Sequence, residues 1–250
     1  SYALPEGTYD IEVLSYGYVS KLEQAQAVAG GQTTTVNFDL RLQAPCLVVS
    51  PASLEQTQPS DTVRQSAALP VDLFGENRMQ ELAQHHADGA YLGKPCHFIG
   101  HLQTNKVRRV VGQAAIIESV SSIRLLSAIA AEARKQGIVQ DILFEINIGE
   151  EDSKMGASAE ALWPMMDDAA SLPSVRLRGL MAIPPAFDNS PESRRWFAMM
   201  RALFEKARAR HPGSAHLDTL SMGMTGSYIA AIEEGATLIR VGTGIYGERS

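Results

Sequence analysis

From about residue 45 onward, short apolar segments alternate with longer amphipathic ones. The segment 142–148 is apolar at most positions, which predicts a parallel strand covered on both faces. The helical pattern before it ends at Arg134, Lys135 and Gly137, basic residues followed by a glycine suited to a left-handed turn. The pattern predicts strands at 46–50 (or as far as 54), 71–75, 96–100, 115–120, 141–148, 175–183, 217–222 and 237–243. It predicts helices between them at 60–68, 77–86, 104–111, 122–136, 158–171, 191–210 and 227–234.

This alternation indicates the fold class. Eight strands separated by helices over about 200 residues favour a (β/α)8 TIM barrel over an open sheet. We therefore assign residues 45–250 to one α/β barrel domain.

The first 44 residues differ from the rest. Apolar and polar residues alternate at 9–13 and 34–40, which is typical of strands. Through the segments 4–9, 16–18 and 31–36, this part resembles the closing strands of carboxypeptidase-regulatory-like β-sandwich modules. Because it is too short to complete such a sandwich, we predict a β-rich extension or fragment. The alternative is an N-terminal extension with no function of its own.

Composition and charge limit the partners and the cellular compartment that we expect. The chain has 22 Lys+Arg against 28 Asp+Glu, a net charge of -6, which gives no reason to expect a nucleic-acid or acidic-membrane partner. The two cysteines, Cys46 and Cys96, cannot form a disulfide framework and favour a reducing compartment, so we expect a cytoplasmic protein. No stretch reaches the roughly 20 apolar residues that a membrane-spanning helix needs.

The turns after the last two expected strands contain the first candidate chemistry. One turn follows Ser221 and includes Met224, and the other follows Arg240 and includes Gly242 and Thr243. Glycines allow close approach to an anion, hydroxyls donate to it, and barrel enzymes often hold phosphate after strands 7 and 8. We predict a phosphate site here; simple tight turns are the alternative. A dinucleotide site at the GxGxxG of 242–247 is disfavoured, because no βαβ unit can follow it within this sequence.

Two other polar groups could serve a site. His97 and His101 lack a helical context and a third ligand, so zinc is disfavoured. Glu145 and Asn147 point the same way on one strand, and they line either a polar pocket or a satisfied polar layer inside the barrel.

Together these motifs resemble the pyridoxal phosphate homeostasis proteins, a family of single-domain barrels similar to the N-terminal domain of alanine racemase. The resemblance runs from about Phe74 to the C-terminus. Its motifs are FGEN at 74–77, HFIGHLQTNK at 97–106, EINIGEE at 145–151, SKMG at 153–156, RGLMAIPP at 178–185, LSMGM at 220–224 and RVGT at 240–243. After Met224, the segment 225–229 departs from the more acidic stretch of the family.

The resemblance implies a pyridoxal 5'-phosphate (PLP) site at the mouth of the barrel. It implies that Arg240 lies near the pyridine nitrogen and that Asn77 and His97 line the ring. It implies that the phosphate contacts Ser221, Met224, Gly242 and Thr243. Since a guanidinium can only donate, the pyridine nitrogen stays unprotonated and the ring is a weaker electron sink. The implied role is to carry or buffer PLP, without catalysis, as a monomer or weak dimer.

The sequence departs from the family at the Schiff-base lysine, which the family places after strand 1 in a Val-Ser-Lys-Thr-x-Pro context. An ungapped alignment from Phe74 puts Gln56 at this position, and we assign the position to it; alignment on the strand at 47–50 puts Pro51 there instead, at the cost of an insertion. Neither side chain is a useful amine nucleophile. Lys21 follows a similar Val-Ser pair but lies far upstream, and we interpret it as a coincidence.

We therefore predict a PLP-binding homeostasis protein whose covalent attachment is lost or weakened. One alternative is a chimeric scaffold or interaction protein that holds no cofactor. Another is a racemase-like PLP enzyme, which would need a lysine at the barrel mouth and an opposing acid or base.

Overall fold

In a computed structural model of the chain, the described residues are 7–13, 21–28, 46–49, 60–149, 155–185, 188, 190–210 and 217–246. The chain divides into two compact units, Ser1–Ala44 and Pro45–Ser250, and each is described by itself. No helix in the described ranges is long and apolar enough to cross a membrane.

The first unit contains one antiparallel strand pair. β1 (Gly7–Val13) includes the strand predicted at 9–13, and it pairs with β2 (Lys21–Val28), which was not predicted. The second predicted strand, at 34–40, lies outside the described residues. The resemblance of this unit to a β-sandwich module stays a prediction.

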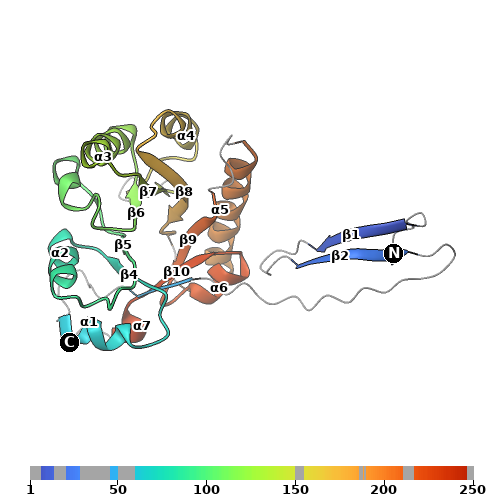
Figure 1. Cartoon of the computed structure of the whole chain (residues 1–250), viewed down its shortest axis with the longest axis horizontal. Helices are drawn as coiled ribbons and strands as arrows, with labels where there is room; N and C mark the ends of the chain where they lie inside the picture. The colour runs from blue at the N-terminus through green and yellow to red at the C-terminus, as the bar shows by residue number, and fades with distance from the viewer. Residues whose placement is uncertain are drawn as a thin grey trace. The chain divides into compact units, whose positions relative to one another are not determined.

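The second unit is a closed barrel, as predicted (Figure 1). Eight parallel strands follow one another in the order β10-β3-β4-β5-β6-β7-β8-β9, and the pairing of β10 with β3 completes the ring. Their bounds are β3 Cys46–Val49, β4 Leu73–Glu76, β5 Cys96–Phe98, β6 Ile116–Val120, β7 Gln140–Ile146, β8 Val175–Ala182, β9 Thr219–Met224 and β10 Leu238–Val241.

Helices surround the strands, close to their predicted positions (Figure 1). They are α1 Ser60–Ala67, α2 Met79–Ala87, α3 Ile123–Gln136, α4 Leu162–Ala170, α5 Pro191–Arg210, α6 Tyr228–Glu233 and α7 Thr243–Tyr246. The predicted helix at 104–111 is a 3-10 helix, η1 (Thr104–Arg109). The short helix α7 was not predicted, because the sequence pattern extended the last strand to residue 243.

Local sequence explains why α3 begins and ends where it does. The Ser122 side chain accepts a hydrogen bond from the backbone N–H of Leu125 at 3.2 Å, which satisfies one free donor of the first turn. At the other end, Gly137 has φ 69°, the left-handed conformation predicted for this glycine.

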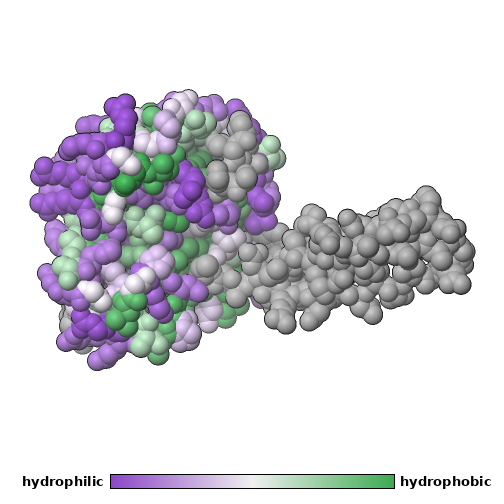
Figure 2. Space-filling view, in the orientation of Figure 1, coloured by the Kyte–Doolittle hydropathy of each residue, from purple (hydrophilic) through white to green (hydrophobic). Residues whose placement is uncertain are grey.

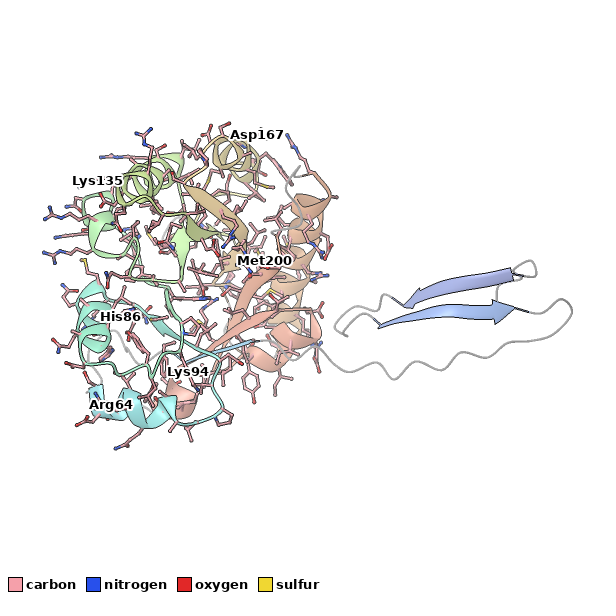
Figure 3. The ribbon with its side chains drawn as sticks, viewed as in Figure 1. Arg64, His86, Lys94, Lys135, Asp167 and Met200 are labelled. Atoms are coloured by element: carbon pink, nitrogen blue, oxygen red, sulfur yellow. The ribbon has the colours of Figure 1, made fainter. Side chains whose placement is uncertain are left out.

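Apolar residues fill the space between the strands and the helices. Phe74, Phe144, Phe197 and Phe204 are almost completely buried there. Met200 of α5 is also buried, and Figure 3 shows it on the side of this helix that faces the strands. The outer surface over α2 and α3 is mainly hydrophilic (Figure 2).

The interior of the barrel begins with a charged group near the amino ends of the strands. Asp141 accepts hydrogen bonds from Arg176 at 2.6 and 2.8 Å and from Arg178 at 2.8 Å. Arg178 also pairs with Asp218. A small apolar cluster of Ile116, Leu143 and Met181 is next along the strands. Alternate residues of each strand thus build distinct layers inside the barrel.

Close packing between β9 and α6 depends on Gly223. This residue has φ +91°, and an added Cβ would overlap the Cβ of Ala231 on α6. A side chain here would therefore meet a steric clash as well as backbone strain.

Gly93 offers a matched comparison, because it has φ +83° and no atom within 4 Å of an added Cβ. Both Gly→Ala substitutions carry the backbone strain of a positive φ, about 1–2 kcal/mol. We expect G223A to lose about 1–3 kcal/mol more stability than G93A, because only Gly223 is overpacked. Urea unfolding of both variants measures the difference, and equal losses would contradict this account of the β9–α6 contact.

Candidate functional site

A layer of polar side chains lies inside the barrel toward the carboxyl ends of the strands. His97 on β5, Glu118 on β6, Glu145 on β7, Ser221 on β9 and Arg240 on β10 are all buried. Glu118 and Glu145 are each two residues beyond a member of the apolar cluster, Ile116 and Leu143, on the same face of their strands. We call these five residues the polar layer.

Glu118 is the centre of the hydrogen bonds in this layer. Its Oε1 accepts from His97 Nδ1 at 2.6 Å, and its Oε2 accepts from Ser221 Oγ at 2.6 Å. Arg240 donates through Nη1 to Ser221 Oγ and through Nη2 to the Ala182 carbonyl at 3.1 Å. Arg240 Nη1 is also 3.9 Å from Glu118 Oε2. The buried cation Arg240 and the buried anion Glu118 are thus linked directly, as an ion pair, and also through the hydroxyl of Ser221.

The pKa values of the two carboxyl groups of the layer are shifted in opposite directions. Burial would raise the pKa of Glu118, but its hydrogen bond from His97, the charges of His97 and Arg240, and the Ser221 hydroxyl outweigh burial and lower it. Burial raises the pKa of Glu145, and attraction to Arg240 opposes this only in part. Burial lowers the pKa of Arg240, with Glu118 and Glu145 opposing.

Glu118 was not predicted as a site residue from the sequence, although the strand that carries it was predicted. The available signal was a single carboxylate within the apolar segment Ile116–Val120. A charge in such a segment has to be paired, since an isolated buried carboxylate is very costly. The partner could not be identified, because Arg240 is 122 residues away in the sequence (240 − 118).

The predicted phosphate turns lie side by side at the carboxyl ends of β9 and β10. The backbone N–H groups of Gly242 and Gly244 both donate to Thr225 Oγ1, at 3.3 and 3.2 Å. The Met224 N–H donates to Ser227 Oγ at 3.2 Å. Two backbone donors that converge on one oxygen atom are the arrangement that anion sites use. The hydroxyls concerned come from the segment in which this sequence departs from the family.

The structure separates the predicted phosphate contacts into two groups. Ser221 belongs to the polar layer, where its proton is donated to Glu118, while Met224, Gly242 and Thr243 lie at the turns. Thr243 is exposed.

The motifs of Asn77 and His97 come together on neighbouring strands. Gly75 pairs with His97 in the β4–β5 register. The chain segments that follow these strands also approach closely, because a Cβ on Gly100 would overlap the Asn77 carbonyl. Asn77 and His97 are thus brought to the same part of the barrel mouth. His101 is exposed, and the described residues contain no group of three or more His, Cys, Asp or Glu side chains that could hold a metal.

Both candidate Schiff-base positions, Pro51 and Gln56, lie outside the described residues. The strand before them, β3, ends at Val49, and its Val48 pairs with Arg240. Pro51 is therefore two positions after the strand end (51 − 49), whereas Gln56 is seven positions after it (56 − 49).

The lysine side chains that the structure describes do not contribute to the polar layer. Lys94 donates to the Leu69 and Val71 carbonyls at 2.8 and 2.7 Å. Lys135 pairs with Glu132 of the same helix, α3, at 3.8 Å, and Figure 3 shows Lys135 at the outer edge of the barrel. Within the described side chains, no lysine forms a hydrogen bond or ion pair with the layer.

Comparisons with known proteins agree with this geometry. Residues 60–250 match the family model "Alanine racemase, N-terminal domain". The pyridoxal phosphate homeostasis protein of Aquifex aeolicus is 38% identical over 194 residues, 78% of this chain and 84% of that protein. The protein of the same name from Pseudomonas aeruginosa is 33% identical over 231 residues, 92% of each chain.

Solved structures agree as well. PipY of Synechococcus elongatus, in a structure with PLP bound, superposes with a TM-score of 0.72 at 29% identity, covering 81% of this chain and 92% of that chain. Alanine racemase of Clostridium difficile superposes with a TM-score of 0.60 at 15% identity, covering 82% of this chain and 53% of that one, which supports the fold alone.

The two buried glutamates predict opposite effects of the same substitution. The lowered pKa of Glu118 means that its contribution to stability is present above its unfolded value, about 4.3, and is lost as pH falls through the folded value. The raised pKa of Glu145 means that ionising this residue is less favourable in the folded state than in the unfolded state. Glu145 therefore destabilises the fold increasingly as pH rises from about 4.3 through its folded pKa.

At pH 7 we therefore expect Glu118→Gln to destabilise the barrel by about 3 kcal/mol, because it leaves Arg240 without its buried anion. Glu145→Gln should leave stability unchanged or increase it. Urea unfolding at pH 7 and pH 4.5 measures both effects. If E118Q yields too little folded protein, Ser221→Ala, which removes one donor to Glu118, should give a smaller loss of the same sign. Equal losses for E118Q and E145Q would contradict the distinction.

Proposed function

The chain belongs to the alanine racemase N-terminal domain family, and on this premise we propose that it binds PLP at the barrel mouth and serves in PLP homeostasis. Relatives that carry the name pyridoxal phosphate homeostasis protein support this role, as does the PLP-bound structure of PipY. We propose that it acts in the cytoplasm as a monomer or weak dimer, without a nucleic-acid partner.

One observation carries the proposal: just after the strand that holds the buried Arg240, the N–H groups of Gly242 and Gly244 converge on one oxygen atom, the hydroxyl of Thr225. The turns would hold the phosphate through these donors by exchanging their hydrogen bonds with the Thr225 hydroxyl, with Met224 and Thr243 beside them. Ser221 would reach the phosphate only by exchanging its hydrogen bond with Glu118. Thus the donor set at the mouth suits a phosphorylated ligand.

Arg240 would face the pyridine nitrogen, and Asn77 and His97 would line the ring. PLP supplies an electrophilic aldehyde and an electron-accepting ring when it is bound. Arg240 remains charged and can only donate, so it favours an unprotonated nitrogen and a weaker electron sink. This chemistry suits carrying or buffering PLP better than carbanion catalysis. It gives no support to the racemase-like alternative, nor does any described lysine side chain.

We propose that this chain has lost the covalent attachment of PLP that the family makes through its lysine. The end of β3 at Val49 supports Pro51 over Gln56 as the occupant of that position, because the family's lysine directly follows strand 1. Phosphate contacts do not depend on a covalent bond, so reversible binding is still expected.

Reversible binding predicts a rise in melting temperature with excess PLP. Binding at 100 times the Kd would stabilise the fold by about 2.7 kcal/mol. We expect a smaller rise with inorganic phosphate and none with pyridoxal, which lacks the phosphate. An unchanged melting temperature at millimolar PLP, with no change in PLP absorbance, would favour the scaffold alternative.

Loss of the covalent bond predicts that PLP followed by borohydride leaves no stoichiometric adduct on a lysine at the pocket, as judged by intact mass and peptide mapping. Restoring the lysine should create one. We expect Pro51→Lys to give a single adduct of about one PLP per chain at position 51, because its ε-amine can condense with the aldehyde.

Gln56→Lys is the matched control for this experiment. If Gln56→Lys forms the adduct and Pro51→Lys does not, the strand 1 register proposed above is wrong. A stoichiometric adduct at the pocket in the unmodified chain would overturn the claim that attachment is lost.

A further inference from the structure

Glu145 differs from the rest of the polar layer because one of its oxygens is unused. The residue is only 6% exposed, and its Oε2 is buried with no hydrogen-bond partner among the described residues. Glu118, in the same layer, has both oxygens hydrogen-bonded. A buried carboxylate without a donor carries a desolvation cost that nothing in its described surroundings offsets.

The backbone holds Glu145 firmly in place. Its carbonyl accepts the Ala157 N–H at 2.8 Å, and Ala157 in turn accepts the Asn147 N–H at 2.9 Å. Its neighbours Phe144 and Ile146 are almost completely buried on the outer face of β7. These contacts fix the main chain at Glu145, so its side chain starts from a defined position inside the barrel.

Arg240, the nearby cation, is already engaged by other groups. Its guanidinium donates to Ser221 Oγ and the Ala182 carbonyl and lies close to Glu118. Attraction to Arg240 does not offset the burial of Glu145, whose pKa stays raised. Unless it takes up a proton, Glu145 thus needs a donor or a cation that the described side chains do not supply.

We infer that Glu145 receives the cationic amino group of a phosphorylated pyridine ligand, so that the site selects pyridoxamine 5'-phosphate, the amine form of the cofactor, over the aldehyde. The inference rests on the proposed function. Glu145 is at the same end of the barrel as the phosphate turns, with only β8 between its strand and β9. An ammonium donates three hydrogen bonds, whereas an aldehyde oxygen only accepts and would oppose a carboxylate.

The absence of the family's lysine strengthens this choice. With Pro51 or Gln56 at that position, the aldehyde has no amine there with which to condense, so its chemical advantage over the amine form is lost. A positively charged ligand would also replace the positive charge that a lysine would have brought to the barrel mouth.

Isothermal titration of the full chain with three ligands tests the inference. Pyridoxamine 5'-phosphate carries the amine, PLP carries the aldehyde, and pyridoxine 5'-phosphate carries a neutral hydroxyl of matched size. We expect the amine form to bind about tenfold or more tightly than the hydroxyl form, as a charge-assisted hydrogen bond implies. Glu145→Gln should reduce this ratio to within about threefold, because the amide carries no charge.

Glu132→Gln, on the outer helix α3, is the control and should keep the ratio of the unmodified chain. A preference for the amine form that survives in E145Q would overturn the role of Glu145. Equal binding of all three ligands by the unmodified chain would overturn the inference and leave the proposed function standing. Binding of none of them would overturn the proposed function itself.

Discussion

A guanidinium inside a protein must be neutralised and fully hydrogen-bonded, and the barrel interior is organised around this requirement for Arg240. The charge is met by Glu118, while the donors are taken up by Ser221 and the Ala182 carbonyl. His97 completes the coordination of Glu118. These side chains come from β5, β6, β9 and β10, so a single buried cation links strands from both halves of the barrel.

Two charged groups lie at opposite ends of the barrel interior. Near the amino ends of the strands, Asp141 and its two arginine partners satisfy one another, and the apolar cluster of Ile116, Leu143 and Met181 separates them from the polar layer. At the carboxyl ends, the hydroxyls of Thr225 and Ser227 accept the backbone donors of the turns, and the interior presents a carboxylate with an unused oxygen. Among the residues of the polar layer, Glu145 is the one whose buried oxygen lacks a partner that a ligand would supply.

The proposed loss of the family's lysine gives these remaining contacts their importance. When a covalent bond anchors a ligand, selectivity can rest on the reacting aldehyde; without it, selectivity has to come from the phosphate donors and from charged groups such as Arg240 and Glu145. The proposed substitution would therefore change the basis of recognition while the barrel and its glycine turns are retained.

The sequence by itself determined the barrel, since eight apolar segments and the helices between them follow from local periodicity. It also pointed to the two turns proposed to hold phosphate, because glycines and hydroxyls at strand ends are local signals, whereas the role expected of Arg240 came from the family resemblance. Only the tertiary structure decided that Arg240 meets Glu118, that Thr225 caps the Gly242 and Gly244 amides, and that Glu145 is left with an unused oxygen. The reason is physical: partners inside a barrel are set by strand register and ring closure, and neither is encoded in the spacing of residues along one strand.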